Sequence, residues 1–279
     1  MSFFPAFLIR SLRRTRGAMA LGLALAAAAA HAAPFEVAVS PSRFELTARS
    51  GTRLGQSLDI HNLGSAATEV SVRTIDWTYS PEGQIGYHDE LMPGSCRPWV
   101  TLERRSVSVP ARGKRTFRFQ VEPPADAARG ECRFMIALEG AEPAQQTVIR
   151  SGGASLSLPV TGRIAVAVYV MLDGAEPKLE MRQMAVRDVA GKRVPTVSVT
   201  NSGDAHGRLD GVLDAKDAQG RTFTLAVEGT PILPGQTRIL ALLPKGEDGQ
   251  GTPQPAYPVQ ASGMLDWDKG SFKVEAEFK

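Results

Sequence analysis

The sequence predicts an all-β protein made of two immunoglobulin-like β-sandwich domains. Three observations lead to this fold class. Apolar residues alternate with polar ones over short segments, which is the period of a half-buried strand. Gly, Pro, Asn and Asp interrupt these segments at short intervals, where turns are expected. No helical period continues beyond the first 32 residues, so the helices that would connect the strands of a parallel sheet are not expected.

Residues 1–32 have the features of a secretory signal peptide. Four arginines and no acidic residue precede an apolar run, Gly17–Ala30. At 14 residues this run is shorter than the roughly 20 that a membrane-spanning helix needs. Ala30-His31-Ala32 then supplies the small-x-small pattern of a cleavage site. We therefore expect secretion with cleavage after Ala32 and no stable membrane insertion. A retained N-terminal anchor is the alternative.

Loss of the signal peptide changes the charge of the protein. The whole chain has a formal charge of +3, and the signal contributes four arginines and no acid, which leaves −1. A net positive field that would attract nucleic acid or an anionic membrane surface is therefore not expected. The remaining 247 residues suit two domains of ordinary size, 33–172 and 173–279. The polar segment Asp173–Pro177 is the expected linker.

Strands are predicted wherever the alternation is clear. In the first domain they are Ser57–Leu63, Thr68–Trp77, Trp99–Val109, Thr116–Val121 and Cys132–Leu138. In the second domain they are Lys178–Val186, Val194–Asn201, Arg208–Ala215, Thr222–Val227, Thr237–Leu243, Pro258–Asp266 and Phe272–Phe278. Many short strands at this spacing are typical of an immunoglobulin-like sandwich.

The mature chain contains two cysteines, Cys96 and Cys132. An even number of cysteines in an exported protein indicates a disulfide, because the compartment is oxidising. Two free buried thiols are the alternative.

One apolar segment is longer than an ordinary strand. From Ser155 to Met171 the apolar residues share one parity over 17 residues, whereas strands usually run 3–10 residues. Its second half, Ile164 to Val170, is expected to cover the core of the domain. Leu156, Leu158 and Val160 at the other end are expected to project apolar side chains toward a partner. Two short strands divided at Thr161-Gly162 are the alternative.

Residue patterns for catalysis are missing. Only His61, His88 and His206 remain in the mature chain, and none has a metal-ligand spacing. The sequence contains neither a GxSxG nucleophile elbow nor a phosphate-binding glycine loop. Asp266–Gly270 has some features of a calcium loop but fits a hairpin turn better. We therefore expect a protein that is not an enzyme and that needs no cofactor or metal.

The first domain resembles the PapD-like periplasmic chaperones of chaperone–usher pili. The resemblance covers most of Phe35–Met171 and is carried by the stretches VAVSPSRFEL, SLDIHNLG and PWVTLERRSVSVPARGKRTFRFQV together with the Leu156–Val170 segment. The second domain is similar only in its size and in its expected immunoglobulin-like fold.

This resemblance implies a chaperone that binds pilus subunits and delivers them to an outer-membrane usher. Such chaperones lend a long strand to a subunit that lacks one and hold the subunit's terminal carboxylate with a basic pair. Carried over by position, the strand residues are Leu156, Leu158 and Val160, and the first carboxylate-binding residue is Arg43. The family's strand lysine is replaced by Ala165, and Arg163, two residues earlier, has the same parity and is the expected substitute. Tyr169 stands where the family has an interdomain arginine.

A structural or adhesive immunoglobulin-like module, including a pilus subunit itself, is the alternative function. A subunit is expected to carry its spare strand at a terminus. Here the surplus apolar strand is internal, which favours the chaperone.

Overall fold

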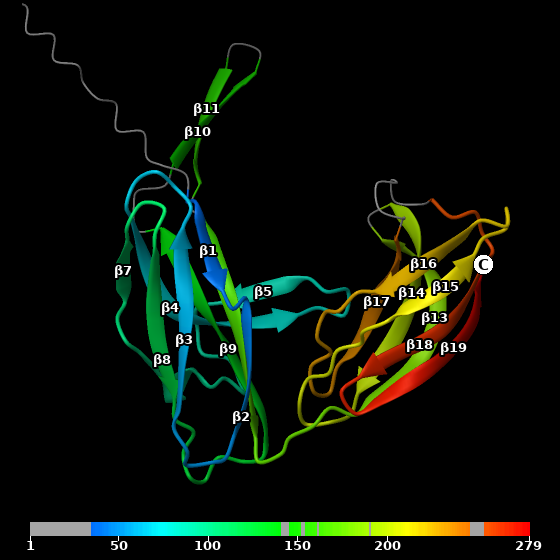
Figure 1. Cartoon of the computed structure of the whole chain (residues 1–279), viewed down its shortest axis with the longest axis horizontal. Helices are drawn as coiled ribbons and strands as arrows, with labels where there is room; N and C mark the ends of the chain where they lie inside the picture. Colours follow the sequence, from blue (N-terminus) through cyan, green and yellow to red (C-terminus); the bar gives the residue numbers. More distant parts are fainter. Residues whose placement is uncertain (1–34, 141–144, 152–153, 161, 190, 246–253) are drawn as a thin grey trace, which may run out of the picture. The chain divides into compact units, whose positions relative to one another are not determined.

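Strands form where the apolar residues alternate, and the all-β prediction is confirmed. The computed structural model describes residues 35–140, 145–151, 154–160, 162–189, 191–245 and 254–279, with the backbone alone for 145–151 and 154–160. The predicted signal peptide, residues 1–32, lies outside the described residues. Figure 1 shows the strands coloured along the chain.

Two sheets form the first sandwich. The four-stranded sheet has the order β1 (Val37–Ser40), β3 (Leu54–Asn62), β8 (Lys114–Val121) and β6 (Val100–Leu102). The six-stranded sheet contains β2 (Arg43–Ala48), β12 (Arg163–Leu172), β9 (Gly130–Gly140), β4 (Thr68–Tyr79) and β5 (Ile85–His88), and β7 (Ser106–Val109) also pairs with β4. Strand β2 runs parallel to β12, whereas the other neighbours in these sheets are antiparallel.

The core between these sheets follows the parity that the sequence predicts. Val166, Val168 and Val170 of β12 are fully buried there. Phe117 and Phe119 of β8 face them from the four-stranded sheet and are also buried. Alternation with a period of two therefore places one face of each strand in the core and leaves the other face free for contacts.

Seven strands form the second sandwich around a core of its own. Their order is β13 (Leu179–Val189), β14 (Lys192–Asn201), β17 (Thr237–Lys245), β16 (Thr222–Val227), β15 (Val212–Lys216), β18 (Val259–Trp267) and β19 (Gly270–Phe278). Asp266–Gly270 forms the hairpin turn between β18 and β19, as the sequence predicts. The predicted linker is held by Asp173, whose carboxylate accepts hydrogen bonds from the backbone and the hydroxyl of Ser50.

Two predicted strands are wrong in detail. Trp99–Val109 is not continuous, because the charged residues Glu103–Arg105 carry the chain from β6 in one sheet to β7 in the other. A short 3-10 helix, η1 (Arg97–Trp99), precedes β6. The strand predicted from Arg208 begins only at Val212. Gly211 before it has a φ of 127°, which favours glycine and interrupts the regular strand.

The long apolar segment is also not one strand. It forms β11 (Ala154–Val160) and β12, the division that the sequence left open. Strand β11 pairs with β10 (Gln145–Ser151) in a separate two-stranded hairpin, which Figure 1 labels. At the division, a Cβ atom on Gly162 would clash with the ring of Phe35, and a Cβ atom on Gly140 would lie 3.1 Å from the same ring. The Gly140 backbone N–H donates to the Gly162 carbonyl. Glycine at Gly162 therefore lets the Phe35 ring close the end of the six-stranded sheet.

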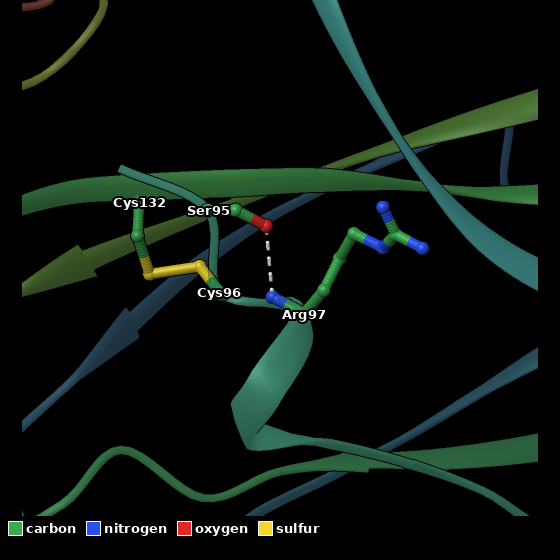
Figure 2. Close-up of a disulfide and its surroundings, with 4 residues drawn as sticks. All are labelled: Ser95, Cys96, Arg97 and Cys132. Atoms are coloured by element: carbon green, nitrogen blue, oxygen red, sulfur yellow. Dashed lines mark hydrogen bonds between the residues drawn. A yellow bond between two sulfur atoms is a disulfide. The ribbon is translucent and has the colours of Figure 1, made fainter. Parts of the chain in front are cut away.

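The predicted disulfide between Cys96 and Cys132 is confirmed. Figure 2 shows it joining the segment before η1 to strand β9, with the two Cα atoms 5.3 Å apart. Beside it, the Arg97 backbone N–H donates to the Ser95 hydroxyl. The Arg97 side chain donates to the buried carboxylate of Asp76, so the segment is held by both covalent and polar contacts.

We predict that replacing both cysteines, Cys96→Ser with Cys132→Ser, lowers the free energy of unfolding by about 4 kcal/mol. The reason is that the crosslink closes a loop with a sequence separation of 36 residues and so restricts the unfolded chain. Urea denaturation with and without reductant measures this difference. Ser95→Ala is the matched control and should change the midpoint only slightly. Equal midpoints for the oxidised and reduced protein would contradict the prediction.

Candidate functional site

The outer face of the six-stranded sheet carries both predicted carboxylate-binding arginines. Odd-numbered residues of β12 point away from the core, because their even-numbered neighbours fill it. Arg163 begins this outward row, and Arg43 lies on β2 in register with Ala167. The structure therefore places Arg43 and Arg163 on the same face.

The two arginines do not contact each other. Arg163 and Ala167 are four residues apart on β12, which corresponds to about 13 Å along a strand. Arg43 is 54% exposed, and its guanidinium forms an ion pair with Glu45 at 2.8 Å. Arg163 is 40% exposed and forms an ion pair with Glu139 on β9. Only a ligand placed between them could contact both.

Small side chains occupy the space between these arginines. Ala165 lies opposite Ala137 of β9, and Ala167 follows two residues later. Ala137 is fully buried, while Ala165 and Ala167 are partly buried. These three alanines are here called the alanine floor, and of the three only Ala165 and Ala167 are partly exposed.

Sequence reasoning missed a third arginine at this floor. Arg73 of β4 lies opposite Ala137, in the same cross-strand row as Ala165. Its guanidinium donates to both carboxylate oxygens of Glu139, at 3.1 and 3.3 Å, and to Asp89 at 2.6 Å. Only the pairing of β12 with β9 and of β9 with β4 brings Arg73 to this place. Spacing along the sequence therefore carried no signal for it.

Glu139 joins two of the three arginines. Burial alone would raise the pKa of its carboxyl, but the hydrogen bonds and charges of Arg73 and Arg163 lower this pKa overall. Glu139 therefore stays ionised and holds both guanidinium groups beside the alanine floor.

Strand β11 contains the residues predicted to bind a pilus subunit, Leu156, Leu158 and Val160. Their backbone pairs with Ile149, Thr147 and Gln145 of β10, respectively. In the part of the chain that the structure describes, no strand pairs with the other edge of β11. Their side chains lie outside the described residues, so their role stays a prediction. An open strand edge can accept a further strand through backbone hydrogen bonds.

Further along, the same sheet face turns apolar and contacts the second sandwich. A cluster around Leu233 of the second sandwich contains the buried side chains of Ile75, Trp77, Met135, Ala137 and Tyr169. Tyr169 accepts a hydrogen bond from Arg208 at 3.3 Å. Tyr169 therefore connects the two sandwiches.

A buried arginine makes a second connection between the sandwiches. Arg238 of β17 is fully buried, and its guanidinium lies 4.7 Å from the centre of the Tyr79 ring. It donates to the carbonyl of Pro81, in the loop between β4 and β5. It also donates to the Pro231 carbonyl and the Thr230 hydroxyl of its own sandwich. One guanidinium thus satisfies acceptors from both sandwiches.

Comparison by sequence finds no matching family model and no matching curated protein. In structure, the chain is similar to the YadV chaperone, with 12% identity, a TM-score of 0.46, and 87% of this chain and 99% of that chain covered. It is similar to the E. coli chaperone DraB, with 15% identity, a TM-score of 0.45, and 87% and 99% covered. It is also similar to a structure of Salmonella enterica SafA pilin in complex with the SafB chaperone. The identity there is 13% and the TM-score 0.46, with 87% of this chain and 97% of that chain covered. At identities this low the similarity concerns the fold alone.

Two further findings concern the described residues. No helix among them is long and apolar enough to cross a membrane. No group of three or more His, Cys, Asp or Glu side chains among them is arranged to hold a metal ion.

We predict that Arg238→Ala lowers the free energy of unfolding by about 3 kcal/mol. The substitution removes the guanidinium donor from the buried Pro231 carbonyl and the Thr230 hydroxyl, and one of two donors from the Pro81 carbonyl. It also removes packing against Tyr79. Thermal or urea denaturation checks this value. Arg187→Ala, at an exposed arginine of β13, is the matched control and should stay within about 0.5 kcal/mol of the parent. A similar small effect for Arg238→Ala would contradict the prediction.

Proposed function

We propose that this protein is a periplasmic chaperone that binds pilus subunits through strand β11 and delivers them to an outer-membrane usher. The observation that carries the proposal is the open edge of β11, whose sequence alternates Leu156, Leu158 and Val160. A subunit that lacks a strand needs both features, because backbone groups supply pairing and alternate apolar side chains fill its core. The proposal involves no catalysis, cofactor or metal.

The alanine floor supports the second half of the proposal. The subunit's terminal carboxylate would lie over Ala165 and Ala167, between Arg43 and Arg163, with Arg73 on the adjoining strand. A planar guanidinium donates two parallel hydrogen bonds to a carboxylate, which a lysine does not. Arginines around the floor therefore offer a physical substitute for the lysine that Ala165 replaces.

Strand β11 and the strand that carries Ala165 and Ala167 follow each other in the chain. Strand β11 ends at Val160 and β12 begins at Arg163, so a bound subunit strand paired with β11 would end near the guanidinium of Arg163. Fixing the carboxylate at one end would set the register of the paired strand. A register error of one residue would turn the apolar side chains of the strand away from the subunit core.

Co-purification from the periplasm of the source organism tests the proposed function. The tagged mature chain should recover a protein with an incomplete immunoglobulin-like sandwich and a free C-terminal carboxylate. Recovery of no such subunit, or of one that remains bound after both substitutions below, would favour the structural-module alternative.

We predict that Arg43→Ala weakens binding of the recovered subunit by roughly 30-fold or more. Removing one partner of a desolvated charge pair costs roughly 2–5 kcal/mol, which corresponds to at least this factor. Titration of the purified subunit against each variant measures the dissociation constant. Arg115→Ala, at an exposed arginine of the four-stranded sheet, is the matched control and should bind like the parent. Equal binding by both variants would overturn the role of Arg43.

We predict that Leu158→Glu abolishes subunit recovery and leaves the thermal midpoint of the free protein unchanged. A carboxylate in the middle of strand β11 would have to be buried in the subunit core at a cost in free energy. Burial of the leucine side chain there instead stabilises the complex by roughly 1.5–3 kcal/mol. Leu63→Glu, at an exposed leucine after β3, is the control and should retain recovery. A large fall in the midpoint of Leu158→Glu would show that Leu158 belongs to the protein's own core.

A further inference from the structure

His206 is the buried ionisable residue that connects the two sandwiches most directly. It belongs to the segment between β14 and β15 of the second sandwich, and its side chain is only 4% exposed. Its imidazole ring stacks on the ring of Tyr169 of β12, with the ring centres 4.0 Å apart. A titratable group is thus enclosed at a contact between two separate hydrophobic cores.

Both ring nitrogens of His206 face carboxylates of the first sandwich. Nδ1 lies 2.5 Å from Oε2 of Glu131 on β9, and Nε2 lies 3.5 Å from Oε1 of Glu45 on β2. A neutral imidazole carries one N–H, whereas an imidazolium carries two. Only the charged form therefore donates toward Glu131 and Glu45 at the same time.

Glu131 depends on His206 for its hydrogen bonds. Its side chain is 0% exposed, and within the described residues its donors are the ring and the backbone N–H of His206, both to Oε2. A buried carboxylate is costly without a compensating charge. Loss of the imidazolium charge would therefore remove the positive charge that faces Glu131 in its buried position.

The other charged groups around His206 form ion pairs with one another. Arg208 and Arg43 both pair with Oε1 of Glu45, at 3.3 and 2.8 Å. Asp204, on the same segment as His206, pairs with Arg129 of the first sandwich at 2.6 Å. Burial raises the pKa of Tyr169, so its phenol stays neutral. Among these groups, only the imidazole changes its charge near neutral pH.

We propose that His206 is a pH-sensitive bridge whose imidazolium holds the second sandwich against strands β2 and β9 of the first. When the imidazolium loses its proton, the bridge loses its charge pairing with Glu131 and the contact loosens. The inference concerns a contact within this chain and does not depend on the proposed chaperone function.

The direction of the pH dependence follows from the surroundings of each group. Burial and the charge of Arg208 lower the pKa of His206, but the hydrogen bonds of Glu131 and Glu45 and the charge of Glu131 raise it overall above 6.5. The bridge is therefore complete below pH 6.5 and weakens as the pH rises through the pKa of His206 in the folded protein. The His206 hydrogen bond lowers the pKa of Glu45 to about 2 from 4.5. The stability that ionised Glu45 adds to the bridge is therefore lost only as the pH falls from 4.5 toward 2.

Nuclear magnetic resonance of the mature chain tests the bridge without any client. His61 and His88 serve as internal references, and the His206 signal is assigned from its loss in His206→Gln. The expected His206 midpoint lies above 6.5, and Glu131→Gln lowers it because the main counter-charge is gone. A midpoint at or below 6.5 in the parent protein, or no change in Glu131→Gln, would overturn the proposal.

Residual dipolar couplings measure the contact itself at pH 5.5 and pH 8.5. Both sandwiches should share one alignment at pH 5.5, and the couplings of the second sandwich should be reduced by motion at pH 8.5. In His206→Gln the couplings should be reduced at both pH values. Asp204→Asn, which removes the exposed ion pair with Arg129, is the matched control and should keep the pH difference. One shared alignment at both pH values in the parent protein would overturn the proposal.

Discussion

Strand β12 is the element on which the other parts of the structure depend. Its even-numbered residues close the core of the first sandwich, and its odd-numbered residues form the outer face with the alanine floor and Tyr169. Its two edges pair with β2 and β9, so it fixes where Arg43, Glu45, Glu131 and Glu139 stand. A shift of one residue would exchange the two faces and place arginine and tyrosine in the core. The free energy lost by exposing the apolar core residues of β12 opposes such a shift and so fixes the geometry of the site.

Two carboxylates, Glu139 and Glu45, each pair with a separate set of basic residues on this face. Glu139 pairs with Arg73 and Arg163 at the alanine floor. Oε1 of Glu45 pairs with Arg43 of the same strand and with Arg208 and His206 of the second sandwich. Glu45 is therefore shared between the candidate carboxylate site and the contact with the second sandwich. Binding an anion at Arg43 would compete with Glu45, so the two regions are physically coupled through one carboxylate.

Local pattern predicted much of this fold, and pairing between distant strands explains what it missed. Alternation located most strands, assigned Ile164 to Val170 to the core and placed Arg43 and Arg163 on a common face. It gave no sign that β2 pairs in parallel with β12 or that Glu103–Arg105 cross between sheets. Arg73 and the partners of His206 were equally hidden, because both depend on registers between distant strands. Composition alone described His206 only as a histidine without a metal-ligand spacing.

The parallel pairing of β2 with β12 also has a consequence for the order of folding. Arg43 and Ala167, which face each other in this pair, are 124 positions apart in the sequence. Because synthesis begins at the N-terminus, β2 is made long before β12, its only partner among the strands that the structure describes. The exposed charges of Arg43 and Glu45 on this strand discourage association with other nascent chains. Residues of the candidate site therefore lie on a strand that cannot pair with β12 until the end of the first domain has been made.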